Sequence, residues 1–471
     1  MVPSPRRRRL SRSLVEILVV LLLLSSGTLT LSYETPQLGA GTVESPANGP
    51  TVVATQGWNA GGYSLSGRPS RLVGVGPNGT AEWIHDGPDR HRNWFYDVDP
   101  LANGNLLVVN PVEGATVVYE FDPDARERVW TERFDSPDIH DVDLINGDEL
   151  LVAGINYDED RRSQDRVFVY NRTRDEVTWE WYFENHYPDD TGEGVTTEDW
   201  THVNDVDRIR EGEFLVSPRN FDQVIVVNRS TKAIDLRLGR DGDYDTLYEQ
   251  HNPEYLESDD GTPTILVADS ENDRIVEYER VGGPPGEGEW KRTWTLTGNL
   301  NWPRDADRLP NGNTLVVDSM NHRVIEVTPN GRIVWETTVP WATYDAERIA
   351  YGDEGQAVYE ERGDAPTMAD LDAGGTYKLH GGRETDPAGL PPIPSVVGGL
   401  LGSTPLSGPI TWAAKRWHHV APWFTPTWMP TWSASLLVVA VVLLVGRTLG
   451  KRIYNSERLR RRFGRFGDDP S

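Results

Sequence analysis

Two long apolar runs lie near the ends of the chain, and short alternating runs fill the part between them. The first, residues 14–31, consists mostly of Leu and Val and carries one charge, Glu16. The second, residues 428–446, begins in a segment rich in tryptophan. Because a membrane span needs about 20 apolar residues in an α-helix, both runs predict transmembrane helices.

Basic residues lie beyond the outer end of each apolar run, at residues 6–12 and 451–462. By the positive-inside rule, both flanks belong in the cytoplasm, and two spans then place residues 33 to about 425 outside the cell membrane. No clear small-residue cleavage pattern follows the first run, so we expect a retained signal anchor rather than a removed peptide.

The middle of the chain repeats one pattern of short strands. In the clearest copy, residues 305–318, two acids one residue apart precede an Asn-Gly pair and an apolar strand. Further copies begin at Asp97, Asp141, Asp205 and Asp345, with a weaker one after His251. An Asn-Gly pair between apolar runs indicates a hairpin, and each unit fits four antiparallel strands. The sequence therefore predicts an all-β fold, a six-bladed β-propeller, with a transmembrane helix at each end.

The ring of blades is expected to close by joining the two ends of this region. The last unit supplies only inner strands, whereas residues 71–75 and 81–83 supply two outer strands without inner ones. Their pairing would hide both sheet edges. The expected order is a basic N-terminus (1–13), a span (14–32), a linker (33–59), the propeller (60–352), a linker with a membrane-proximal segment (353–427), a span (428–449) and a basic tail (450–471).

Charge and composition narrow the function. Acidic residues outnumber basic ones 73 to 46, for a net charge of −27, which argues against nucleic acid as a partner. Dispersed acids with little lysine are typical of a halophilic archaeon, where surface charge maintains solubility. The chain has no cysteine, which excludes disulfides and thiolate metal ligands.

Side chains that could carry out chemistry lie just before the first acid of each repeat. The position directly before that acid, and the position two residues earlier, hold Tyr96, His140, His202, Asn204, His251, Arg304 and Tyr344. Residues two apart on a strand share a face, and the inner strands of a propeller line its channel. We therefore expect these side chains to converge on one axis.

Arg219 joins this group through hairpin geometry. If the turn pairs Arg210 with Glu213 and the hairpin has no bulge, Asn204 pairs with Arg219. Arg219 then lies diagonally across from His202, within side-chain reach.

Histidines beside arginines suit an anionic group. A guanidinium binds oxyanions, and a neutral histidine can attack or accept a proton near pH 7. Three histidines could also bind zinc or copper, but the adjacent arginine disfavours a cation, so we expect no metal. The sequence contains no Walker-type glycine-rich loop and no dinucleotide fingerprint, so we expect no nucleotide donor or other cofactor. A channel that holds only water is the alternative.

These segments resemble the arylsulfate sulfotransferases, in the branch with archaeal membrane-anchored members. The motifs lie at residues 139–143, 200–207, 217–220 and 248–253, and the resemblance covers roughly residues 60–352. It implies a six-bladed propeller and an enzyme that moves a sulfuryl group from a phenolic sulfate ester to an acceptor phenol, without a nucleotide donor.

The resemblance also implies roles for single residues. His251 matches the nucleophile that carries a transient sulfohistidine. His140 and His202 would serve the departing and accepting phenol oxygens, and Arg219 and Asn204 would hold the sulfuryl oxygens. Arg304 and Tyr96 complete the expected substrate-binding set. The bacterial enzymes have a separate N-terminal β domain and a disulfide, and this chain has room for neither, which leaves the identity of the donor and the acceptor open.

Two other functions compete with this one. Residues 318–324 resemble an NHL-type blade, which favours a non-catalytic cell-surface propeller that binds a protein or glycan partner. A structural or adhesive role on the cell surface is the third. A binding module has no reason to place His and Arg in equivalent inner positions, whereas a transferase does.

Overall fold

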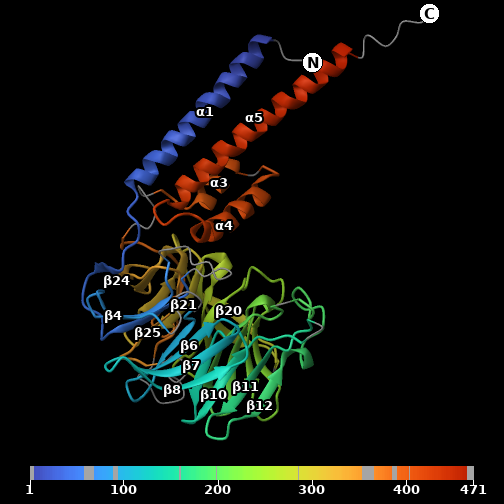
Figure 1. Ribbon diagram of the computed structural model, residues 1–471. Coiled ribbons are helices and arrows are strands. Elements are labelled where there is room, and N and C mark those ends of the chain that lie inside the picture. Colours follow the sequence, from blue (N-terminus) through green and yellow to red (C-terminus); the bar gives the residue numbers. More distant parts are fainter. Residues whose placement is uncertain are drawn as a thin grey trace, which may run out of the picture. The chain divides into compact units, whose positions relative to one another are not determined.

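The computed structural model describes residues 5–57, 68–87, 94–158, 161–197, 199–284, 286–352, 365–383, 390–402 and 404–463. The chain divides into two compact units (Figure 1). One is Pro36–Arg383, and the other combines Met1–Thr35 with Glu384–Ser471. The predicted segments 1–13, 353–427 and 450–471 lie partly outside the described residues, and the division of the chain into segments stays a prediction.

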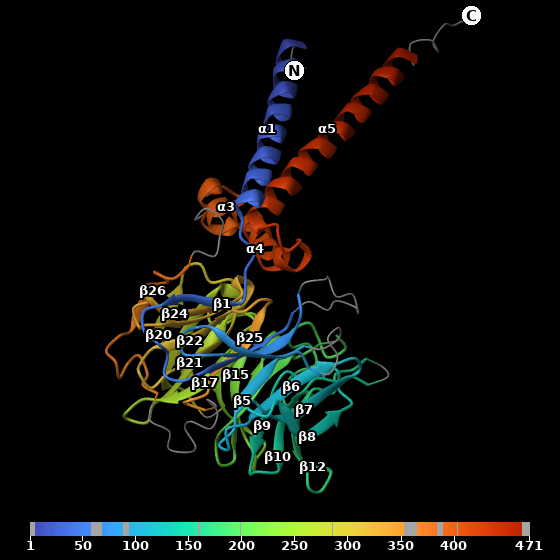
Figure 2. The same ribbon diagram turned by 60° about the vertical axis from the view of Figure 1, so that its left-hand side comes forward.

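The described strands of Pro36–Arg383 form the predicted six-bladed β-propeller (Figures 1 and 2). The short continuous apolar runs of the repeats fit strands that are buried on both faces between neighbouring blades. Four blades consist of consecutive strands, written here from the channel outward in chain order. They are β5 (Asp97–Pro100), β6 (Leu106–Val112), β7 (Ala115–Asp122) and β8 (Glu127–Phe134); β9 (Val142–Ile145), β10 (Glu149–Gly154), β11 (Arg166–Asn171) and β12 (Glu176–Tyr182); β13 (Val203–Arg210), β14 (Glu213–Pro218), β15 (Gln223–Asn228) and β16 (Ile234–Gly239); and β17 (His251–Glu257), β18 (Pro263–Asp269), β19 (Arg274–Gly282) and β20 (Glu289–Thr297).

The other two blades receive strands from the N-terminal side. One contains β21 (Pro303–Arg308), β22 (Thr314–Asp318), β23 (Arg323–Val327) and β24 (Ile333–Thr338), with β1 (Gly39–Val43) on its outer edge. The last joins β25 (Thr343–Arg348) to β2 (Thr51–Thr55), β3 (Arg71–Val75) and β4 (Ala81–His85). A parallel edge strand, β26 (Gly375–Lys378), extends the blade that ends in β20.

The ring closes as predicted, by pairing strands from the two ends of the propeller region, but the number of strands from each end differs from the prediction. The N-terminal side supplies three strands to the last blade and the C-terminal side only β25. The strands β1 and β2 fall in residues 33–59, and β26 falls in 353–427, so both regions predicted as linkers carry propeller strands. β2 is a fully buried run of β-branched residues and Ala. Nothing in its immediate sequence repeats the blade motif, which is why the pattern missed it.

Turns and acids hold the blades in register. Asn146 and Gly147 both have positive φ, 52° and 78°, in the turn between β9 and β10, a backbone conformation that asparagine and glycine adopt most readily. The first acid of a repeat accepts a hydrogen bond from a backbone N–H of the next blade, as Asp345 does from Val98 at 2.9 Å. The same contact joins Asp97 to Val142 at 3.3 Å. The paired acids are therefore part of the blade architecture.

The second unit consists of helices. They are α1 (Pro5–Ser32), α3 (Ile393–Leu401), α4 (Ser407–Phe424) and α5 (Thr431–Phe463). By length and composition, Leu14–Ser32 and Thr431–Arg452 could each cross a membrane, which is compatible with the predicted anchoring. Ser26 and Ser433 join the two helices, because each hydroxyl donates to the carbonyl of the other residue at 2.9 and 3.0 Å.

Candidate active site on the propeller axis

One polar or aromatic side chain from each blade reaches the axis, at or next to the start of each innermost strand. They are Tyr96, His140, Asn204, His251, Arg304 and Tyr344. The rings of Tyr96 and His140 lie 4.2 Å apart between centroids, and those of Tyr96 and Tyr344 lie 4.6 Å apart. The predicted convergence of these residues on one site is therefore present in the structure. Their roles in a reaction stay predictions.

His251 occupies a different register from the predicted one. The sequence pattern placed His251 two positions before the residue that directly precedes the first acid of its repeat. The N–H of Tyr248 binds Asp269 at 2.8 Å, and the N–H of Asn301 binds Asp318 in the next blade at the same distance. Three residues after each of these come His251 and Arg304, so they are equivalent positions. His251 thus belongs to the axial ring itself.

His202 does not lie on a strand. It directly precedes β13 and has a left-handed backbone with φ 43°, so the argument from strand periodicity is wrong for this residue. Its Nδ1 lies 2.5 Å from a carboxyl oxygen of Asp199. Its ring nevertheless packs on that of His140, with 4.5 Å between centroids. His202 therefore reaches the site from the loop before the inner strand.

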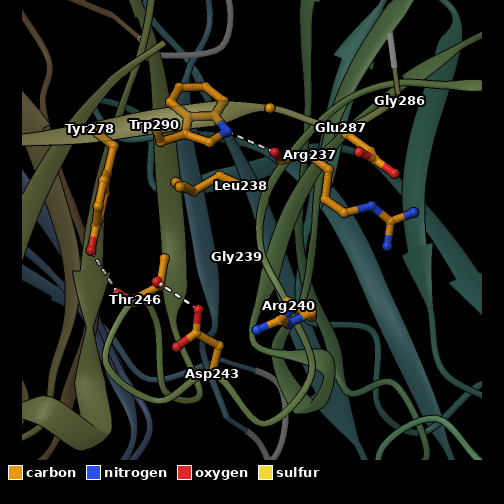
Figure 3. Close-up of a pocket in the computed structure, with 11 residues that line it drawn as sticks. Arg237, Leu238, Gly239, Arg240, Asp243, Thr246, Tyr278, Gly286, Glu287 and Trp290 are labelled. Atoms are coloured by element: carbon orange, nitrogen blue, oxygen red, sulfur yellow. Dashed lines mark hydrogen bonds between the residues drawn. The ribbon is translucent and has the colours of Figure 1, made fainter. Parts of the chain in front are cut away.

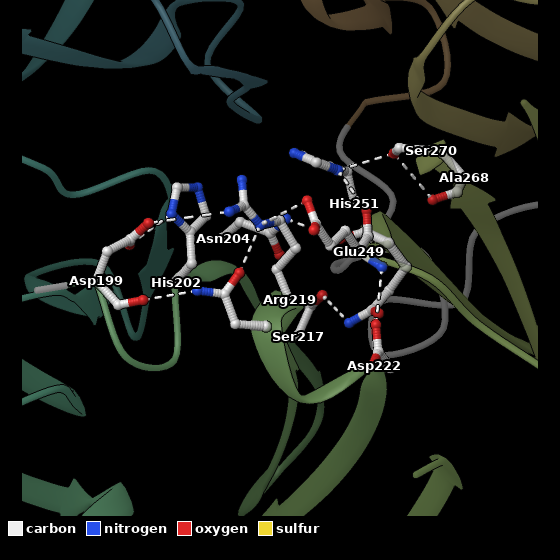
Figure 4. Close-up of polar contacts among 12 residues, drawn as sticks. Asp199, His202, Asn204, Ser217, Arg219, Asp222, Glu249, His251, Ala268 and Ser270 are labelled. Atoms are coloured by element: carbon white, nitrogen blue, oxygen red, sulfur yellow. Dashed lines mark hydrogen bonds and ion pairs between the residues drawn. The ribbon is translucent and has the colours of Figure 1, made fainter. Parts of the chain in front are cut away.

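Arg219 lies in the site, but the predicted pairing with Asn204 is wrong. The hairpin shifts register at two places, Val203 pairs with Pro218, and Arg219 starts the 3₁₀ helix Arg219–Phe221. Figure 4 shows the guanidinium between His202 and Glu249. Carboxyl oxygens of Asp199 and Glu249 each lie 3.9 Å from a nitrogen of this guanidinium. The guanidinium therefore keeps donor capacity for a further anion.

Hydrogen bonds hold His251 in one tautomer. Its Nδ1 lies 2.8 Å from the Ser270 hydroxyl and 3.2 Å from the Glu249 carbonyl (Figure 4). The Ser270 hydroxyl donates its own proton to the Pro303 carbonyl at 2.6 Å, so it accepts from the imidazole. Nδ1 must therefore carry the proton, and Nε2 keeps its lone pair.

Burial, and then the nearby Arg304 and Arg219, hold the pKa of His251 well below its ordinary value. Burial has the same effect on the pKa of His140 and of His202. All three histidines are therefore neutral at neutral pH. A neutral imidazole can act as a nucleophile or accept a proton, whereas an imidazolium can do neither.

Asp138 stands beside His140, with a carboxyl oxygen 3.4 Å from Nε2. Burial and the nearby Asp199 carboxylate raise the pKa of Asp138 to about 7, and a hydrogen bond from Tyr96 opposes this rise. Its side chain is 35% exposed, against 2% for His140. Asp138 is thus a group near the mouth of the site that can carry or release a proton near neutral pH.

Arg304 is buried and held from two sides. Its Nη1 donates to Oε1 of Gln56 at 2.7 Å, and its guanidinium carbon lies 4.5 Å from the ring centroid of Tyr344. The side chain is thereby fixed on the axis. The sequence did not predict a role for Ser270 or Gln56, because neither residue belongs to the repeat pattern or to a recognised motif. It did place Tyr344 in the column of axial positions, although without a role.

A larger hollow lies away from the axis, on the outer strands. Its volume is about 620 Å³, and Figure 3 shows Trp290 and Tyr278 among the residues that line it. Trp290 donates to the Arg237 carbonyl at 2.7 Å, and Tyr278 donates to the Thr246 carbonyl at 2.9 Å. Its lining contains no histidine. It therefore lacks the nucleophile that the axial site offers.

The matched family agrees with the chemistry of this site. Residues 67–295 match the family model for arylsulfotransferase (ASST). The arylsulfotransferase match includes His140, His202, Asn204, Arg219 and His251, and ends before Arg304. The match supports an arylsulfotransferase-like function for the propeller region.

Further comparisons concern whole chains. No curated protein matches the chain. Among solved structures, a protein of unknown function from Bacteroides caccae is 12% identical with a TM-score of 0.42, over 64% of this chain and 98% of that one. The WD40 β-propeller domain of Doa1 is 11% identical with a TM-score of 0.39, over 68% and 95%. A chain of the nidogen/laminin complex is 13% identical with a TM-score of 0.41, over 63% and 97%.

Proposed function

We propose that this chain transfers a sulfuryl group from a phenolic sulfate ester to an acceptor phenol, through a sulfohistidine at His251 and without a nucleotide donor. The observation that carries the proposal is the state of His251. It is buried and neutral, Nδ1 is tied to Ser270 and the Glu249 carbonyl, and Nε2 is left as the nucleophile.

In the first step, Nε2 of His251 attacks sulfur, the bond from sulfur to the phenolic oxygen breaks, and the phenolate leaves. The arginines Arg219 and Arg304 flank the histidine and suit the negative charge on the sulfuryl oxygens. His140 lies next to Asp138, which can supply a proton for the departing oxygen.

In the second step, the acceptor hydroxyl attacks the sulfur of the sulfohistidine, and the bond from sulfur to Nε2 breaks. The hydroxyl proton goes to His202, which is neutral and hydrogen-bonded to Asp199. The positive charge that forms on His202 then lies against a carboxylate. Asn204, whose Nδ2 is held by the Gln250 carbonyl at 2.8 Å, and Tyr96 complete the substrate-binding wall.

The following assay tests this function. The full chain, in detergent and high salt, is incubated with 4-nitrophenyl sulfate, with and without phenol. The proposal requires release of nitrophenol that increases with phenol concentration and shows ping-pong kinetics. A folded protein that releases none with several donors and acceptors would favour the alternative, a surface propeller that binds a protein or glycan. The hollow lined by Trp290 and Arg237 would then be the first place to look for that partner.

We further propose that α1 and α5 anchor the chain in the cell membrane with both basic ends in the cytoplasm and the propeller outside. The apolar segments of the two helices and the basic residues beyond them support this topology.

Ser270 is a positioning residue, and its removal should slow the reaction without changing its class. In Ser270→Ala, Nδ1 keeps only the longer contact to the Glu249 carbonyl, so the other tautomer becomes populated. We expect kcat to fall about tenfold, which corresponds to the free energy of about one hydrogen bond, with little change in KM. Ser270→Thr keeps the hydroxyl and should restore most of kcat. If Thr fails to restore it, or if only KM changes, this role is wrong.

The pH profile should report the lowered pKa of His251. A nucleophile must be deprotonated, so on the acid side kcat/KM falls when pH drops through the pKa of His251, and this acid limb should lie well below pH ~6.5. Removal of a neighbouring positive charge raises that pKa. In Arg304→Gln the acid limb should therefore move to higher pH, whereas Arg229→Gln, in the turn after β15, should leave it in place. An acid limb that stays fixed in Arg304→Gln would contradict the assignment of this limb to His251.

A further inference from the structure

A cluster of carboxylates lies next to the histidines, along the same inner strands. One oxygen each of Asp141, Asp205 and Asp207 lie within 4.8 Å of one another. Asp205 and Asp207 are 4% and 7% exposed. Asp141 directly precedes β9, while the other two belong to β13, so the cluster bridges two neighbouring blades. Carboxylates at this separation repel one another unless a proton or a cation lies between them.

Asn204 provides an independent sign of a ligand in the same cavity. It is 1% exposed, and the donation of its Nδ2 to the Gln250 carbonyl fixes the orientation of the amide. Its Oδ1, at the other end, has no hydrogen-bond partner among the described residues, and Asn204 lines the same cavity as the three aspartates. A buried amide oxygen without a donor is rare, so a group that takes oxygen lone pairs fits this place.

The size of the cavity and the type of ligand atoms around it indicate which ion could bind there. The cavity has a volume of about 10 Å³, the space of one water molecule or ion. Carboxylate and amide oxygens are ligands for hard cations. Mg²⁺ usually keeps several of its waters, for which this cavity has no room, whereas Ca²⁺ accepts a cage made largely of protein oxygens. We propose that Asp141, Asp205 and Asp207 bind one Ca²⁺ ion on the propeller axis, with Oδ1 of Asn204 as a further ligand.

The site adds to the proposed function and does not depend on it. The arginines disfavour a metal on the histidines, and this site uses none of the histidines. His140 directly precedes one ligand, Asp141, and Asn204 directly precedes another, Asp205. A bound ion would therefore fix two residues of the axial ring and cross-link the blades that carry them. Because ion binding is measured without substrate, its failure and the failure of sulfuryl transfer are separate results.

The test measures Ca²⁺ binding to the full chain in detergent after treatment with a chelator. Isothermal titration calorimetry should show one tight site per chain, above any weak binding to the acidic surface. Asp207→Asn should lower the affinity at least ~100-fold, since loss of a direct ligand exceeds the 10–100-fold typical of an outer partner. Asp307→Asn is the matched control. Asp307 pairs with Leu315 as Asp207 pairs with Leu215, and both are 7% exposed. It should bind Ca²⁺ as the parent does.

Three results would overturn the proposal. They are an absence of tight Ca²⁺ binding in the parent, unchanged binding in Asp207→Asn, and equal losses in Asp207→Asn and Asp307→Asn. If Asp207→Asn does not fold, the parent alone decides. Saturating Ca²⁺ should raise the Tm of the parent protein by roughly 3–5 °C above that of the chelator-treated protein. This increase should be larger than the increase with Mg²⁺. A Tm that does not respond to Ca²⁺ would overturn the site.

Discussion

His251→Gln should lower kcat for sulfuryl transfer by at least ~10⁴-fold, because it removes the only group that carries the sulfuryl between donor and acceptor. Gln keeps an amide donor that can still reach the Ser270 hydroxyl and the Glu249 carbonyl, so the blade should fold. The other axial histidines have different proposed roles. His202, whose Nδ1 lies 2.5 Å from Asp199, accepts the proton of the acceptor, and His140 lies beside Asp138, which serves the departing oxygen.

The measurement is nitrophenol release from 4-nitrophenyl sulfate with saturating phenol. The matched control is His186→Gln, since His186 is an exposed histidine that stacks on Trp181, outside the axis. The control should keep the activity of the parent. More than a small residual activity in a folded His251→Gln protein would show that the nucleophile is another residue.

Arg219→Gln should lower kcat by about 10²–10³-fold, the usual effect of removing one group that stabilises charge in the transition state. Arg219 lies 3.9 Å from both Asp199 and Glu249, which orient the guanidinium without satisfying all of its donors. The charge on the sulfuryl oxygens and on the departing phenolate changes during transfer, so the loss should appear mainly in kcat.

The control for this residue is Arg229→Gln, because Arg229 is a partly exposed arginine of the same blade that pairs with Glu149 at 3.3 Å. Arg219→Lys should recover only part of the activity, since a lysine offers a point charge and not a planar fork. A rise in KM with unchanged kcat would mean that Arg219 only attracts the anionic substrate.

The fold was predictable because the blade motif repeats with its hairpin signals. The acids that begin each copy also hold the blades together, since they accept hydrogen bonds from the next blade. The strands that close the ring were less visible. β2 shares no motif with the other blades, and its neighbour Gln56, which holds Arg304, lay in a predicted linker.

The site was predictable as a set of residues but not as a geometry. The bulges near Val203 and Arg208 shift the hairpin that carries Arg219, and short sequences do not reveal such bulges. The left-handed backbone at His202 likewise depends on the loop before β13. Asp138 and Ser270 act through their distances to His140 and His251. Sequence spacing alone could not give these distances, because the two partners of His251, Ser270 and Glu249, come from different strand connections.

The most direct test of the central claim is a single-turnover experiment with 4-nitrophenyl sulfate labelled with ³⁵S, in the absence of phenol. The account predicts a burst of one nitrophenol per chain and one ³⁵S label, located by peptide mass spectrometry on His251 and removed when phenol is added. Turnover with phenol but without a burst or a label would mean direct transfer between the substrates. A label on any other residue would contradict the assignment of His251.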